Sequence, residues 1–219
     1  MFFFVFAVAL AGPPAAEIEQ SCRSGNGAAC LTAANQWQGS SEVQGHVRAR
    51  EYAALGCTYG DAESCTLQAS HMSFGPEKNL AESARLYHLA CDRGSARGCG
   101  GWASALERGE GVARDVSAAW PLYKKSCDAG DRFACYDLGR LHTSGSAPIP
   151  SDRAAAFEYY RRSCDMGFDD ACLRAGDNRK SAGDSATART WFTKGCQKGS
   201  SLACDRIKEL DGKPVYYEY

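Results

Sequence analysis

Twelve cysteines in six pairs of one spacing, C-x₂-G-x₄-C, constrain this chain more than any other feature of its sequence. The cysteines of each pair are eight residues apart, and the pairs recur every 32 to 37 residues. Each pair has a glycine three residues after its first cysteine and a small residue directly before its second. The pairs are Cys22 with Cys30, Cys57 with Cys65, Cys91 with Cys99, Cys127 with Cys135, Cys164 with Cys172 and Cys196 with Cys204. A period of this length is typical of stacked helix-pair repeats.

The spacing within a pair predicts a turn between two helices. Eight residues of one continuous helix span about 12 Å, whereas a disulfide needs Cα atoms within roughly 7 Å of each other. Glycine readily adopts the left-handed conformation that ends many helices. We therefore predict that one helix ends near each first cysteine, that the next begins near the second, and that a disulfide joins them. Closing so short a loop stabilises the fold by about 2.5 kcal/mol per bridge in the chain-entropy model.

Other uses of the cysteines fit the pattern less well. Structural zinc sites use C-x₂₋₄-C knuckles gathered in fours, redox pairs are usually C-x-x-C, and a catalytic thiol is single rather than repeated six times. The four histidines are dispersed over different repeats and form no H-x-H or H-x₃-H pair; they are His46, His71, His88 and His142. We expect no metal and no cofactor.

The first residues and the composition indicate where the chain works. Residues 1–16 begin with an apolar run and end in Pro-Pro-Ala-Ala, as a signal peptide does, although no basic residue precedes Arg23. The run is too short to span a bilayer, and an even number of paired cysteines fits an oxidising compartment. We expect a periplasmic or secreted protein with no stable membrane insertion. The net charge of −1 provides no electrostatic attraction for nucleic acid.

Small and large residues also recur in register with the cysteines. Large apolar or aromatic residues stand four and five positions before most first cysteines, and a small residue stands four positions after each second cysteine except the last. The small residues are Ala34, Ala69, Ala103, Gly139 and Gly176, and Lys208 replaces them in the final unit. Small residues opposite large ones allow two helices to pack closely.

One segment carries the pattern most completely. It reads Gly109-x-Gly111-Val112-x-x-Asp115, then Ala118-Ala119, Tyr123 and Cys127-Asp128-x-Gly130. This frame resembles the Sel-one-like repeat, a relative of the tetratricopeptide repeat, and the paired cysteines resemble the cysteine-rich secreted Hcp type. The resemblance implies an all-α fold, a right-handed α/α superhelix. We expect one solenoid over residues 17–213, with about five repeats and partial units at its ends, and a C-terminal tail over residues 214–219.

In such a superhelix, the helix after each second cysteine is expected to line the concave surface. Its positions two and five residues after the cysteine then face inward. The candidate binding residues at these positions are Asn35, Ser70, Ser104, Asp137, Arg140, Arg174, Asp177, Arg206 and Glu209. Side chains that differ from repeat to repeat on the same helical backbone favour recognition of a protein or peptide partner. The alternative is that the charges only form local ion pairs on a solvated helix face.

The resemblance to Hcp proteins also implies a second function, because β-lactam binding and hydrolysis have been ascribed to them. A serine β-lactamase usually shows S-x-x-K, S-D-N and K-T-G, and none of these motifs occurs here. No G-x-S-x-G and no phosphate-binding G-x₄-G-K-[ST] is present either. We therefore assign no catalytic residue. The favoured hypothesis is a non-catalytic binding scaffold, and the alternatives are a β-lactam-binding protein or weak hydrolase, or a purely structural or signalling role.

Overall fold

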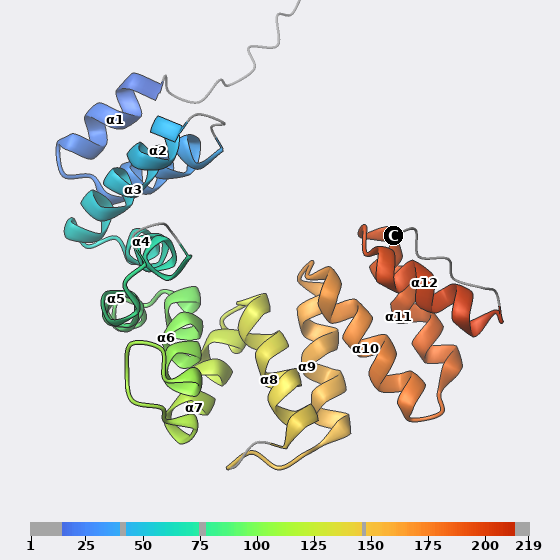
Figure 1. The fold of residues 1–219 in the computed structure, drawn as a ribbon. Helices are drawn as coiled ribbons and strands as arrows, with labels where there is room; N and C mark the ends of the chain where they lie inside the picture. Colours follow the sequence, from blue (N-terminus) through green and yellow to red (C-terminus); the bar gives the residue numbers. More distant parts are fainter. Residues whose placement is uncertain (1–14, 40–42, 75–77, 146–147, 213–219) are drawn as a thin grey trace, which may run out of the picture.

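The computed structural model describes residues 15–39, 43–74, 78–145 and 148–212, and within these ranges every regular element is a helix. Figure 1 shows the helices following one curved path from α1 to α12. The odd-numbered helices are α1 (Ala15–Arg23), α3 (Val43–Thr58), α5 (Leu80–Asp92), α7 (Val116–Asp128), α9 (Arg153–Asp165) and α11 (Ser185–Gln197). The even-numbered helices are α2 (Gly27–Gln38), α4 (Ala62–Phe74), α6 (Ala96–Arg108), α8 (Arg132–Ser144), α10 (Asp169–Ser181) and α12 (Ser201–Leu210).

The predicted terminal segments lie largely outside the described residues. Of the expected signal peptide, only Ala15 and Ala16 are described, as the first residues of α1. The expected tail, residues 214–219, lies outside the description altogether. Nearly all of the described residues lie within the predicted solenoid, residues 17–213. Their all-α repeat architecture is confirmed.

All six predicted disulfides are present, and no cysteine is free. Each joins the end of an odd-numbered helix to the first turn of the next even-numbered helix, with Cα–Cα distances of 4.3–4.8 Å. The predicted pairing is confirmed bridge by bridge: Cys22 is bonded to Cys30, Cys57 to Cys65, Cys91 to Cys99, Cys127 to Cys135, Cys164 to Cys172 and Cys196 to Cys204. Every turn between two helices that the cysteine spacing predicted is therefore closed by its own bridge.

The glycine within each bridged turn has a φ of +92° to +102°. After α7, for example, the Gly130 N–H donates to the Cys127 carbonyl (3.0 Å), and the Asp131 N–H donates to the Ser126 carbonyl (3.1 Å). The left-handed glycine turn is thus confirmed as the way each odd-numbered helix ends.

The residue after each of these glycines directly precedes the next helix, at its N-cap position. In five of the six turns its side chain accepts a hydrogen bond from a backbone N–H of the first helical turn, which stabilises a helix start by about 1 kcal/mol. These residues are Asn26, Asp61, Ser95, Asp131 and Ser200. Phe168 stands at the sixth position and makes no such bond. Its ring instead packs edge-on against Phe133 and Tyr136, with centroids 5.1 Å away in each case.

Small residues allow the disulfide-linked helices to approach so closely. The residue before the first cysteine faces the residue before the second, as Ala90 and Gly98 do. A Cβ placed on Gly98 would lie 2.6 Å from the Ala90 Cβ, well inside van der Waals contact. The small residue predicted before each second cysteine therefore has a steric cause.

The even-to-odd connections contain the other predicted turn. After α6, Gly109 and Gly111 have positive φ values of 71° and 74°, and a Cβ on Gly111 would collide with the backbone of Leu80. Val112 packs against the apolar core of this region. Asp115 then caps α7 by accepting a hydrogen bond from the Ala118 N–H (2.9 Å).

Within the core, large residues of odd-numbered helices pack on small residues of even-numbered ones. Tyr123 and Phe192 are fully buried in this way. A Cβ on Gly139 would lie 2.7 Å from the ring of Tyr160, and Phe192 covers Gly176 equally closely. The predicted alternation of small and large residues is therefore confirmed, and each even-numbered helix with the odd-numbered helix that follows it forms one packed repeat.

Candidate functional site

The even-numbered helices lie on the inner side of the curved array. We call the face of these helices that carries the nine predicted binding residues the inner surface. Successive even-numbered helices contact one another in four of the five cases, whereas among the odd-numbered helices only α1 and α3 make comparable contact in the described chain. Helices on the inside of a curve are closer together than those outside. The predicted residues belong to α2 (Asn35), α4 (Ser70), α6 (Ser104), α8 (Asp137, Arg140), α10 (Arg174, Asp177) and α12 (Arg206, Glu209).

Three of the predicted residues in the N-terminal half line two small grooves of balanced charge. Asn35 and Ser70 line a groove of about 230 Å³, whose single acid and single base are Glu63 and Arg97. Ser104 lines a second groove of about 100 Å³, in which Arg108 and Glu110 are the charged side chains. Each of these two grooves is therefore lined by one acid, one base and otherwise uncharged side chains.

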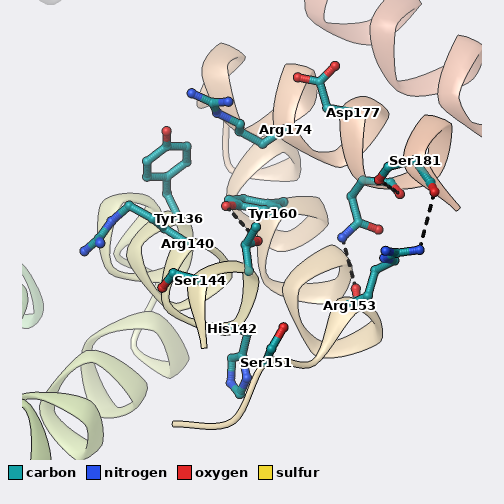
Figure 2. Close-up of a pocket in the computed structure, with 12 residues that line it drawn as sticks. Tyr136, Arg140, His142, Ser144, Ser151, Arg153, Tyr160, Arg174, Asp177 and Ser181 are labelled. Atoms are coloured by element: carbon teal, nitrogen blue, oxygen red, sulfur yellow. Dashed lines mark hydrogen bonds between the residues drawn. The ribbon is translucent and has the colours of Figure 1, made fainter. Parts of the chain in front are cut away.

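A larger groove of about 590 Å³ opens between α8, α9 and α10, and we call it the α8–α10 groove (Figure 2). It contains three predicted residues, Arg140, Arg174 and Asp177. The rest of its lining is polar or aromatic and consists of Tyr136, His142, Thr143, Ser144, Ser151, Arg153, Tyr160, Asn178 and Ser181. In Figure 2, Arg140, Tyr136 and Arg174 lie along one side of the groove, and Arg153 and Ser181 lie at the other end.

Arg140 is held by acidic side chains of its own chain. Its guanidinium donates to both carboxylate oxygens of Glu107 on α6, each 2.6 Å away, and its Nε donates to Asp137 Oδ1 at 3.3 Å. The hydroxyl of the fully buried Tyr123 on α7 donates to the same Glu107 carboxylate at 2.9 Å. Asp137 and Arg140 therefore take part in a polar cluster that ties three helices together.

The electrostatics of this cluster follow from its burial. Burial raises the pKa of the Asp137 carboxyl against the opposing effect of Arg140. Burial likewise raises the pKa of the Tyr123 hydroxyl, and the nearby Asp137 and Glu107 charges raise it further. Burial alone would lower the pKa of Arg140, but Glu107 and Asp137 outweigh it and raise that pKa. The guanidinium is thus charged and committed to internal partners.

The charged residues of α10 and α12 are arranged differently. Arg206 of α12 pairs with Asp177 (3.3 Å) and with Glu209 (2.8 Å), and Lys180 of α10 also pairs with Glu209 (3.0 Å). Three of the predicted residues therefore belong to one half-buried network that bridges two helices. Arg174 makes no ion pair with any described residue, and a hydrogen bond with Tyr136 raises the pKa of its guanidinium.

Sequence reasoning missed the part of the groove contributed by α9 and by the residues before it. Tyr160 was expected only as a packing residue, yet its hydroxyl lies 3.3 Å from Thr143 Oγ1 at the groove wall. Arg153, the first residue of α9, points its guanidinium toward the Ser181 carbonyl. The contact of Glu107 with Arg140 was not predicted from the sequence either, because the two residues are 33 positions apart. Periodicity marks positions within a repeat but not pairs between repeats.

The groove chemistry suits hydrogen bonding and anion recognition. Hydroxyls, amides and guanidinium groups line it. The lining includes no lysine, the residue that activates the serine in a serine β-lactamase. His142 is buried, stacks on Tyr159 with centroids 5.5 Å apart, and has no hydrogen-bond partner at Nδ1 among the described residues. Within the same residues, no three His, Cys, Asp or Glu side chains gather as a metal site would require.

The family model of the Sel1 repeat matches residues 68–95, 97–131, 132–168 and 171–200, which together make up more than half of the chain. The chain belongs to the Sel1 repeat family. The matched segments correspond to the pairs α4–α5, α6–α7, α8–α9 and α10–α11, the first beginning within α4. The disulfides Cys91–Cys99, Cys127–Cys135 and Cys164–Cys172 each join one matched repeat to the next. The resemblance drawn from the cysteine and glycine frame is confirmed at the level of the family.

Solved Sel1 repeat proteins share this fold at low sequence identity. A Sel1 repeat protein from Oxalobacter formigenes superposes with a TM-score of 0.74 at 20% identity over 90% of this chain and 59% of its own. A protein from uropathogenic Escherichia coli, described as the protective antigen c5321, gives 0.65 at 19% over 91% of this chain and 52% of its own. A Sel1 repeat protein from Klebsiella pneumoniae gives 0.65 at 23% identity over 91% of this chain and all of its own.

This Sel1 repeat chain thus spans little more than half the length of the first two structures. None of the curated proteins compared with it matches. No helix in the described ranges has the length and apolar character needed to cross a membrane.

Proposed function

We propose that this Sel1 repeat protein is an exported scaffold that binds an extended segment of a protein partner along its inner surface and catalyses no reaction. The observation that carries the proposal is the alignment of grooves on one face of a constant helical frame. Each groove includes predicted inner positions, but the lining side chains differ from repeat to repeat. Such variation on a fixed backbone suits recognition of one particular chain.

Export is supported by the six disulfides. Bridges of this kind persist in a periplasm or outside the cell and are rare in the reducing cytosol. If the protein is exported, alkylation of freshly harvested cells without reduction should leave all twelve cysteines unlabelled. Labelled cysteines in the mature protein would contradict export to an oxidising compartment.

A substitution that fills the α8–α10 groove without changing its charge tests binding at the inner surface. Thr143→Trp places a large side chain there, and Thr190→Trp on α11 is its matched control. Both threonines are exposed, and both donate from Oγ1 to the carbonyl four residues earlier, at 2.8 Å and 3.3 Å respectively. Either variant should melt close to the wild type.

The assay is cross-linking capture from the producing cells, with the oxidised wild type and the two variants as baits and quantification by mass spectrometry. A partner recovered with the wild type and Thr190→Trp, but lost with Thr143→Trp, supports the proposal. Equal recovery by all three baits, or recovery of no partner by any, contradicts binding at this surface.

A further inference from the structure

The α8–α10 groove carries positive charge that the protein itself leaves uncompensated. Three arginines and one acid line it, namely Arg140, Arg153, Arg174 and Asp177. Glu107 and Asp137 neutralise Arg140, and Asp177 pairs with Arg206. Arg153 and Arg174 remain, and neither pairs with an acid within the described chain. Both side chains are exposed, so their charge is accessible to a ligand.

One ion pair that joins successive helices on either side of the groove is absent at the groove itself. Position eight after the second cysteine holds Glu107 in α6 and Lys180 in α10, and each pairs with position five of the next even-numbered helix, Arg140 or Glu209. In α8 the same position is Thr143, which cannot pair with Asp177. Helices α8 and α10 also make less contact than any other successive pair on the inner surface.

The walls of the groove suit a peptide better than a small free anion. The rings of Tyr136 and Tyr160 provide apolar surface, and hydroxyls of Thr143, Ser151 and Ser181 surround them with hydrogen-bonding groups. A volume of about 590 Å³ lies in the usual range of ligand pockets and far exceeds one carboxylate or phosphate. Guanidinium groups form paired hydrogen bonds with carboxylates, which fixes the geometry of the contact.

We propose that the α8–α10 groove binds an acidic stretch of the partner chain, with Asp or Glu carboxylates on Arg153 and Arg174. This inference rests on the proposed function and adds the chemical character of the partner. The two grooves nearer the N-terminus each carry one acid and one base, so they give no comparable preference for acidic side chains. The acidic stretch therefore lies at the end of the bound segment nearest α10.

The test is selection of a random-peptide phage library on the immobilised, oxidised protein, followed by fluorescence anisotropy with the selected peptides. We expect enrichment in Asp and Glu, and binding that weakens as salt is added because exposed charges are screened. The double substitution Arg153→Gln, Arg174→Gln should weaken binding about tenfold or more. The control Arg85→Gln, Arg161→Gln makes the same change in net charge on odd-numbered helices and should leave binding unchanged.

The outcomes separate this inference from the proposed function. Peptides that Thr143→Trp excludes but that show no acidic enrichment, and that bind the arginine double variant normally, overturn the inference and leave the proposed function standing. Peptides that bind Thr143→Trp as tightly as the wild type contradict both this inference and the proposed function. Displacement of the acidic peptides by inorganic phosphate more strongly than by chloride at equal ionic strength would assign the groove to a free anion and overturn the peptide assignment.

Discussion

At the scale of single residues, a charge on the inner surface is not the same as a charge available for binding. Arg140 and Arg174 were predicted by one rule, yet Arg140 is bound by Glu107 and Asp137, while Arg174 hydrogen-bonds with Tyr136 and forms no ion pair with a described residue. Arg140 stands five residues after its cysteine, within reach of Glu107 in the preceding repeat, whereas Arg174 stands two residues after its cysteine, beside Tyr136. The ion-pair alternative therefore describes Arg140 and Arg206, and the binding hypothesis concerns Arg174.

The Glu107 cluster should contribute measurably to stability. Glu107→Ala leaves the buried Tyr123 hydroxyl without its acceptor and removes the main partner of Arg140. Because Glu107 is 10% exposed but Arg140 is 38% exposed, we expect a loss of about 2–4 kcal/mol rather than the full penalty of a buried pair. Urea unfolding of the oxidised protein measures it.

The control for this prediction is Glu158→Ala, which removes an exposed pair with Arg161 on a single helix. Such pairs contribute about 0.5 kcal/mol or less. Equal losses for the two variants would mean that the Glu107 cluster is no stronger than a surface ion pair.

At the scale of elements, the disulfide turns combine a covalent bond with close packing of small residues. A Gly→Ala change inside a helix ordinarily stabilises by up to about 1 kcal/mol. Gly98→Ala should do the opposite, because the new methyl group would lie 2.6 Å from the Ala90 Cβ and force α5 and α6 apart. We expect a loss of about 1–3 kcal/mol in thermal or urea unfolding.

The exchange Ala90→Gly, Gly98→Ala provides the control, since it moves the methyl group from one helix to the other. It should recover most of the lost stability relative to the single variant. If the exchange is no more stable than Gly98→Ala alone, contact between the two Cβ atoms is not the cause of the loss.

Structural features could be predicted from the sequence where the residues that determine them lie close together in the chain. The cysteine, the left-handed glycine and the capping residue lie within a few positions of one another. The positions at which helices begin and end near the cysteines could therefore be predicted from the sequence. Phe168 departs from the capping pattern because its ring packs against Phe133 of the preceding even-numbered helix. The groove wall on α9 and the Glu107 contact were missed for the same reason, since both depend on which repeats become neighbours.

At the scale of the whole molecule, the disulfides strengthen the junctions between repeats. Helices within a Sel1 repeat, such as α6 and α7, pack over a larger interface than helices across a junction, such as α7 and α8. The stability of a repeat array is approximately a sum of repeat terms and interface terms. A disulfide at every junction therefore stabilises the weaker interfaces and holds neighbouring repeats together.

This arrangement predicts that the effect of removing a disulfide depends on its place along the chain. Cys127→Ala, Cys135→Ala removes the staple between α7 and α8, and Cys196→Ala, Cys204→Ala removes the one that fixes α12. Each removal costs about 2.5 kcal/mol in the chain-entropy model. The interior removal should loosen the junction between α7 and α8, whereas the terminal removal should release α12 alone.

Hydrogen exchange measured by mass spectrometry distinguishes the two results. Because local opening determines exchange, faster exchange should spread through α7 and α8 in the interior variant and remain confined to α12 in the terminal one. The intact α6–α7 and α8–α9 interfaces limit the interior effect to the junction itself. Uniformly faster exchange along the chain in both variants would show instead that the array is one cooperative unit whose junctions do not depend on individual disulfides.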